Sequence, residues 1–128
     1  MPIFDSLQAG SNLGLLVLRI VIALIFVIHS LPKLKQPGMM AKGLGMPASA
    51  VTLLGLVELV GGVGVGIGLF PRLCAIVLSV VMLGAMYYKI MVWKVPFSAH
   101  DKTGWEFDLL ILAANIIIIT AGSGTISL

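Results

Sequence analysis

Charged side chains are scarce in this chain of 128 residues. Lysine, arginine, aspartate and glutamate together make up 10% of it, whereas 59% of the residues are hydrophobic. A soluble domain carries charge at about a quarter of its positions. We therefore predict an integral membrane protein, long enough for about four spans of about 20 residues and too short for a further soluble domain. Residues 1–128 are expected to form a single transmembrane domain.

Cysteine pairs, metal-binding patterns and basic runs are also missing, and each absence excludes a class of function. Cys74 is the only cysteine, so one chain has neither an internal disulfide nor a CxxC thiol-exchange motif. The two histidines, His29 and His100, stand in no pattern such as HExxH, and we predict no metal site. No basic run carries interleaved aromatic rings, which argues against nucleic acid as a partner.

Four apolar runs predict four transmembrane helices. They cover residues 13–31, 50–70, 73–93 and 105–121. Pro32 is expected to end the first span, and Pro71–Arg72 gives the second and third a very tight connection. The segment before Leu13 lacks the lysine or arginine of a signal peptide, so the first span is expected to be retained. The predicted fold class is therefore an all-α membrane protein, an antiparallel four-transmembrane-helix bundle.

Basic residues are unevenly distributed between the connections, which predicts how the chain crosses the membrane. The connections on one side carry Lys33, Lys35, Lys42, Lys94 and Lys102. The opposite side has only Arg72 and the N-terminal amine. The positive-inside rule places the lysine-rich loops in the cytoplasm and both termini outside. The expected location is a bacterial or archaeal cytoplasmic membrane.

Several ionisable residues lie within the apolar runs, where charge is costly. A charged side chain at mid-bilayer costs about 2.5–3.5 kcal/mol on insertion scales. We therefore expect Arg19 to face the protein interior and to meet an anion, with Glu58 of the second span as a candidate partner. Lys33 falls on the same helix face as Arg19. A second cluster, near Glu58 and toward the cytoplasmic side, is expected to contain His29, Lys89, Glu106 and Asp108.

Glycines recur in the second span at a spacing of four residues, Gly62 with Gly66 and Gly64 with Gly68. Small residues at this spacing allow helix backbones to approach closely in lipid. The alternative is that glycine leaves space for a ligand beside Glu58.

The buried charges have two open interpretations. They can be interhelical pairs that fix the register of the helices. They can instead form a buried polar site for protons, a quinone or a small substrate, because ionisable residues inside a membrane mark function by default. In that case the candidate catalytic groups are Glu58, as a proton acceptor, and His29, since histidine titrates near physiological pH. The candidate ligand-binding residues are Arg19, Lys33, Lys89, Trp105, Glu106 and Asp108.

Three motifs together resemble the DoxX family of small four-span membrane proteins. They are LRIVIALIFVIHSLPKL in the first span, LLGLVELVGGVGVGIGLFPRL in the second and GWEFDLLIL at the start of the last. The matching positions are Arg19, His29, Lys33, Glu58, Gly61, Gly62, Arg72, Gly104, Trp105, Glu106 and Phe107. Ser30 stands where the family often has glycine. Asp108 stands where the family usually has an apolar residue, which adds an anion at the cytoplasmic end.

The resemblance implies a link to redox chemistry. Founding members of the family are associated with thiosulfate:quinone oxidoreductase, and others with redox-stress complexes or with quinone and catechol detoxification. This chain shows no flavin, haem or iron–sulfur motif, so it would bind a quinone, relay protons or anchor a catalytic partner.

The leading hypothesis is accordingly a DoxX-like membrane subunit with a buried polar site, linked to redox chemistry, that binds a quinone or another small molecule or relays protons. A non-enzymatic anchor or assembly factor and a small oligomeric transporter are the alternatives. The expected partners are membrane lipid, a quinone-like molecule, and a redox protein or further copies of the chain.

Overall fold

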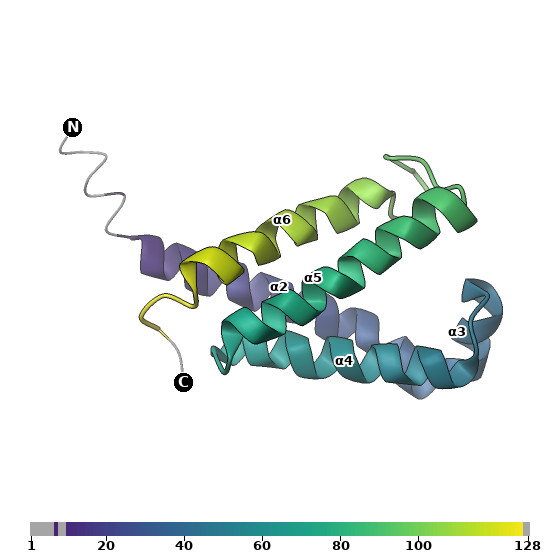
Figure 1. Ribbon diagram of the computed structural model, residues 1–128, viewed down its shortest axis with the longest axis horizontal. Coiled ribbons are helices and arrows are strands. Elements are labelled where there is room, and N and C mark those ends of the chain that lie inside the picture. Colours follow the sequence, from purple (N-terminus) through teal and green to yellow (C-terminus); the bar gives the residue numbers. More distant parts are fainter. Residues whose placement is uncertain (1–6, 8–9, 127–128) are drawn as a thin grey trace.

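The computed structural model describes Leu7 and residues 10–126, and within that part of the chain all regular structure is helical. The helices are α2 (Ser11–Lys35), α3 (Pro37–Leu44), α4 (Ala48–Ile67), α5 (Pro71–Tyr87), the π-helical turn η1 (Tyr88–Val92) and α6 (Trp105–Ala121) (Figure 1). The all-α prediction is confirmed for these residues. The expected placement of both chain termini on the outer side concerns residues outside the described part.

Three helices are long and apolar enough to cross a membrane. They are α2, α4 and the continuous segment Pro71–Val92 formed by α5 and η1. This finding supports the predicted integral membrane protein. The fourth apolar run forms α6, whose bounds match the prediction of residues 105–121 and whose length is 17 residues. That α6 also crosses the membrane stays a prediction.

The expected end of the first helix at Pro32 was wrong. Pro32 lies inside α2, which continues to Lys35. A proline inside a helix removes one backbone hydrogen bond. Packing outweighs that loss, because Gly55 lets α4 approach so closely that a Cβ there would lie 3.0 Å from Cβ of Lys33. The ion pair between Lys33 and Glu58 fastens the same turn.

The segment expected to be a loop between the first two spans contains a further helix, α3. Pro37 occupies its first turn, where a missing N–H costs little. Gly45 ends it in the left-handed conformation, with φ of 71°. Proline in the first turn and glycine after the last residue are typical of a helix. The eight residues of α3 are nevertheless too few to give a clear periodic signal.

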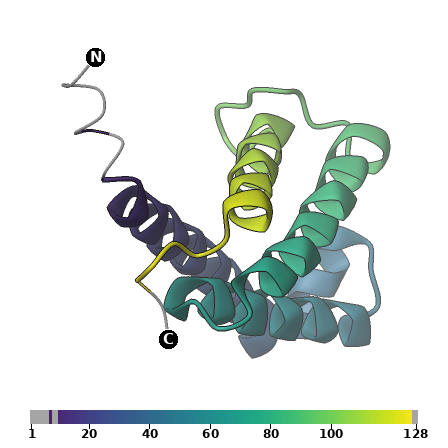
Figure 2. The same cartoon turned by 60° about the vertical axis from the view of Figure 1, so that its left-hand side comes forward.

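The helices form two neighbouring pairs, α2 with α4 and α5 with α6, joined by contacts between α4 and α5 (Figures 1 and 2). Figure 1 shows the end of α2, the start of α4, the end of the α5 segment and the start of α6 at one end of the molecule. We call this the lysine-rich end. The opposite end, where α6 gives way to residues 122–126, is called the tail end.

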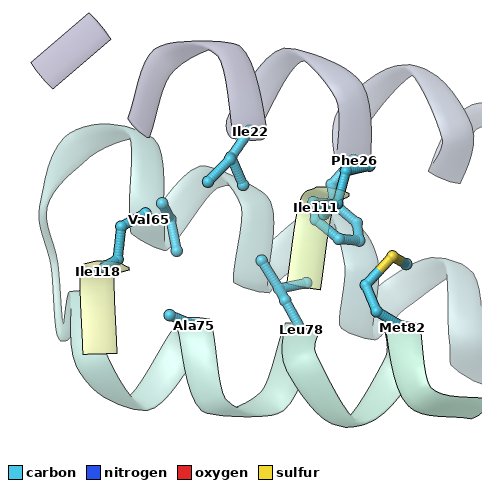
Figure 3. Close-up of a cluster of buried hydrophobic side chains, with 8 residues drawn as sticks. All are labelled: Ile22, Phe26, Val65, Ala75, Leu78, Met82, Ile111 and Ile118. Carbon is cyan, nitrogen blue, oxygen red and sulfur yellow. The ribbon is translucent and has the colours of Figure 1, made fainter. Parts of the chain in front are cut away.

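The apolar core lies between the helices, and each of the four longer ones contributes to it. It contains Ile22, Phe26, Val65, Ala75, Leu78, Met82, Ile111 and Ile118 (Figure 3). The glycines of α4 are placed against this core. A Cβ at Gly62 would lie 2.9 Å from Cβ of Phe26, and one at Gly61 would lie 2.9 Å from Cδ2 of Leu78. The packing interpretation is therefore confirmed for Gly62, and a Cβ at Gly64 or Gly66 would likewise lie under 3.0 Å from Cys74 or Ala23. Gly68 instead ends α4 in the left-handed conformation.

Candidate functional site

Arg19 is buried at the tail end, and its hydrogen bonds within the described part of the chain all go to backbone carbonyls. Its exposed fraction is 1%. Nε donates to the carbonyl of Val65 (3.0 Å) and Nη2 to that of Gly66 (2.9 Å). Nη1 donates to the carbonyls of Ser123 (2.8 Å) and Ile126. The guanidinium therefore joins the last turn of α4 to the segment that follows α6.

The expected ion pair between Arg19 and Glu58 is not formed, although the predicted inward orientation of Arg19 is correct. The last four carbonyls of an α-helix have no hydrogen-bond donor within the helix, and they carry a partial negative charge. With Nε and Nη2, Arg19 meets this partial charge at the end of α4, and among the described residues it contacts no carboxylate.

Glu58 pairs instead with Lys33, across the contact between α2 and α4. Lys33 Nζ lies 2.9 Å from Glu58 Oε2, and both side chains are largely buried. Nζ also donates to the carbonyl of His29 at 3.2 Å, one turn earlier in α2. This second bond orients the lysine along its own helix, so that its charge lies against α4.

Asp108 pairs with Lys89, between η1 and the first turns of α6. Lys89 Nζ lies 2.7 Å from Asp108 Oδ2, 2.9 Å from Thr103 Oγ1 and 3.4 Å from the carbonyl of Gly104. It also lies 5.6 Å from the centre of the Phe107 ring. Lys89 belongs to the single π-helical turn among the described helices, and such turns occur frequently at functional sites.

A cavity of about 630 Å³ lies at the lysine-rich end and brings both ion pairs together. Most of its wall is apolar and comes from α2, α3, α4, α5, η1 and α6. Its polar members are His29, Lys33, Glu58, Tyr88, Lys89, Trp93, Thr103 and Asp108. An apolar hollow of this size with a few convergent polar groups has the character of a small-molecule site.

Aromatic rings line the cavity beside the charges. The imidazole of His29 lies 5.6 Å from the ring of Phe107, and Tyr88 lies 5.4 Å from Trp93 between ring centres. His29 donates no side-chain hydrogen bond to any of residues 10–126, so its ring nitrogens are available to a ligand. The hollow therefore offers flat apolar faces and polar edges at once.

The structure separates the predicted site residues into two groups. His29, Lys33, Glu58, Lys89 and Asp108 line the cavity. Arg19, Trp105 and Glu106 do not, because Arg19 lies at the tail end, Trp105 packs edge-on against Phe97 at 4.6 Å, and Glu106 is exposed. The described part of the chain contains no group of three or more histidine, cysteine or acidic residues that could hold a metal ion.

Comparison with known proteins places this arrangement in a family. The family model described as DoxX matches residues 14–93 of the chain. The chain belongs to the DoxX family. The resemblance noted in the sequence is thereby confirmed, although the motif at the start of α6 lies beyond the matched residues.

Two relatives of this DoxX protein extend the similarity to most of its length. One, from Bacillus subtilis (strain 168), is named "Putative oxidoreductase CatD" and is 30% identical over 122 residues, which cover 91% of this chain and 85% of the relative. The other, an uncharacterized protein from Haemophilus influenzae, is 32% identical over 113 residues, covering 87% and 84%. No solved structure matches the chain.

Sequence reasoning overlooked the contact of Trp93, which joins the residue after η1 to the end of α3 in this DoxX protein. Its indole Nε1 donates a hydrogen bond of 3.3 Å to the carbonyl of Leu44, the last residue of α3. Both residues line the cavity. Its position near the end of a span suggested an interfacial ring, and the sequence contained no signal for a partner 49 residues earlier.

Replacing Trp93 by phenylalanine is expected to loosen α3, because this hydrogen bond is lost while an aromatic ring is retained. Amide hydrogen exchange of residues 37–44 should accelerate by about fivefold to tenfold, the equivalent of one hydrogen bond of about 1 kcal/mol. Trp105→Phe is the matched control, since the indole of Trp105 donates no hydrogen bond within the described chain. Equal exchange of α3 in both variants would contradict the assignment.

Proposed function

We propose that this DoxX protein is the membrane component of a redox system and binds a quinone-class aromatic molecule in the cavity at the lysine-rich end. The observation that carries the proposal is the pairing of an apolar, ring-lined hollow with two buried lysine–carboxylate pairs. A quinone consists of a flat apolar ring with polar oxygens at its edge. The hollow matches both parts.

The side chains would hold and protonate such a molecule. The rings of Tyr88, Trp93 and Phe107 offer stacking or edge contacts to a flat ligand. Lysine ammonium groups donate hydrogen bonds to ring oxygens, and carboxylates or imidazole exchange protons with them. The electrons would come from a partner protein. The name of the Bacillus subtilis relative supports a role in oxidation and reduction.

The proposal includes a membrane arrangement. We infer that α6 forms a fourth span and completes an antiparallel four-helix bundle, because its 17 residues fall at the lower limit for crossing the hydrocarbon core. By the positive-inside rule, the lysines gathered at one end favour a cytoplasmic position for that end, and with it for the cavity. A quinone dissolved in the bilayer would then reach the site near the cytoplasmic interface.

The experiment that tests the proposal uses the two tryptophans as separate reporters. In Trp105→Phe protein reconstituted in nanodiscs, the remaining Trp93 lies in the cavity wall, and titration with menadione should quench its fluorescence with saturation. In the matched Trp93→Phe protein, Trp105 lies outside the cavity and should show only the linear quenching of a quinone dissolved in lipid. Linear quenching in both proteins would contradict a quinone site.

A non-enzymatic anchor is the second candidate function. The contacts of Arg19 favour it, because they show that at least one buried charge serves to fasten the fold. Under this alternative the two lysine–carboxylate pairs would be structural as well. Absence of saturable quenching, together with lower thermal stability of Glu58→Gln protein, would support the anchor.

A further inference from the structure

The two ion pairs of the cavity differ in how the lysine meets its carboxylate. An ammonium group has three N–H donors. Lys33 Nζ uses two, toward the carbonyl of His29 and Oε2 of Glu58, and retains one for a ligand. Lys89 Nζ donates to Thr103 Oγ1 and the carbonyl of Gly104, and it lies 2.7 Å from Asp108 Oδ2, which accepts no hydrogen bond from the described residues. Of the two pairs, only Lys33–Glu58 is therefore held by a hydrogen bond within the described part of the chain.

Glu58 has an open hydrogen-bond acceptor, as Lys33 has an open donor. Lys33 engages only its Oε2. The second oxygen, Oε1, accepts no hydrogen bond from any residue that the structure describes. Because Lys33 and Glu58 both line the cavity, the pair offers one hydrogen-bond donor and one acceptor side by side.

We propose that the Lys33–Glu58 pair selects the reduced, hydroxyl-bearing form of the aromatic ligand over the quinone. A ring hydroxyl accepts a hydrogen bond from Lys33 and donates one to Glu58, so both open positions are filled. A quinone carbonyl accepts only, and it would bring its lone pairs against the carboxylate oxygen. A buried acceptor that loses its donor costs binding energy. This inference rests on the proposed function and deepens it by naming the form of the ligand that the site prefers.

Preference for the reduced form has a consequence for the redox potential of the bound ligand. Tighter binding of the reduced form stabilises it relative to the oxidised form, so the midpoint potential of the bound couple rises. For a two-electron couple, each tenfold difference in affinity raises it by about 30 mV. The site would therefore draw electrons toward the bound quinone.

The test compares three probes that share one ring system under anaerobic conditions: menadione, menadiol and the dimethyl ether of menadiol. Titrations of Trp105→Phe protein in nanodiscs, corrected for partition of each probe into lipid, should give menadiol the lowest Kd by about tenfold. The dimethyl ether retains the ring and oxygen acceptors but lacks the O–H donor, so it should not share this advantage. Saturable binding of all three probes with equal Kd would overturn the preference while leaving the proposed function intact, whereas no saturable binding would overturn both.

Substitutions then test whether the Lys33–Glu58 pair causes the preference for the reduced ligand. Glu58→Gln places an amide beside Lys33, and an amide N–H₂ can donate to a carbonyl, so the ratio of the two affinities should shift toward menadione by tenfold or more. Glu106→Gln makes the same chemical change on an exposed side chain outside the cavity and should leave the ratio unchanged. A shift of the ratio in Asp108→Asn protein in place of Glu58→Gln protein would overturn the assignment. If Glu58→Gln protein did not fold, the wild-type ranking of the three probes would still decide the preference.

Discussion

Arg19→Met is expected to lower the free energy of unfolding by about 3 kcal/mol, because hydrogen bonds from a charged group to buried carbonyls are lost. Methionine fills much of the same volume, so the loss isolates the guanidinium. Without it, four buried or partly buried carbonyls, those of Val65, Gly66, Ser123 and Ile126, lose a donor. Each acceptor left unsatisfied costs about 1–3 kcal/mol. The carbonyl of Val65 keeps the N–H of Gly68, and relief from burying a charge offsets a further part of the sum.

The measurement is thermal unfolding in detergent, with hydrogen exchange of residues 119–126 as a local readout. Arg19→Lys should fall between wild type and Arg19→Met, because lysine keeps the charge but has fewer donors in a less spread geometry. Arg72→Met is the matched control, since Arg72 lies at the same end of the molecule but is exposed. The assignment fails if Arg19→Met and Arg72→Met unfold at the same temperature.

Gly62→Leu is expected to separate α2 from α4 and to lower the free energy of unfolding by about 3 kcal/mol. A Cβ at this position would lie 2.9 Å from Cβ of Phe26, whose exposed fraction is 1%, so neither group can move aside into free space. Overpacking a close contact costs about 1–3 kcal/mol and occasionally more. In lipid the full cost of lost packing applies, because close van der Waals packing is itself a main source of helix association.

Gly14→Leu provides the control for this prediction. Gly14 is exposed on α2, and a Cβ there would meet nothing within 4 Å. Both substitutions replace glycine by a better helix former, a gain of about 0.5–1 kcal/mol for each, so their difference reports the interhelical contact. Circular dichroism during thermal unfolding measures both. A loss of stability in Gly14→Leu equal to that in Gly62→Leu would contradict the packing argument.

Local sequence patterns predicted the helices well and the ends of helices less well. Uninterrupted apolar runs located α4, the α5 segment and α6, because few structures other than a helix satisfy backbone polar groups in lipid. Pro32 misled the prediction of the first helix, since the force that carries α2 past it comes from Gly55 and Glu58, which lie more than 20 residues later. Proline is a local signal, and it was overridden by contacts between distant residues.

In the candidate site, too, local sequence predicted some properties of the side chains, whereas contacts between distant residues decided others. The cost of isolated charge in lipid indicated that Glu58, Lys89 and Asp108 would turn inward. Lys33 was counted among the lysines of a cytoplasmic connection, although it shares a helix face with Arg19. Their pairing was not readable, since each acidic group had several cationic candidates at similar depth. The same cost of isolated charge predicted an inward Glu106. The first turn of α6 directs Glu106 outward, and Asp108, two residues later, faces the cavity.

The sequence by itself determined that this protein belongs in a membrane, where its long helices run, and that its ionisable residues could not face lipid singly. Those conclusions follow from hydropathy and chain length, which are properties of each segment taken alone. Only the tertiary structure decided that Arg19 binds carbonyls at a helix end, that Glu58 meets Lys33, and that both lysine–carboxylate pairs border one cavity. The reason is physical: an embedded charge requires an opposite charge or dipoles that compensate it. Which of these lies within reach depends on how closely glycine lets the helices approach and on the rotation of each helix about its axis.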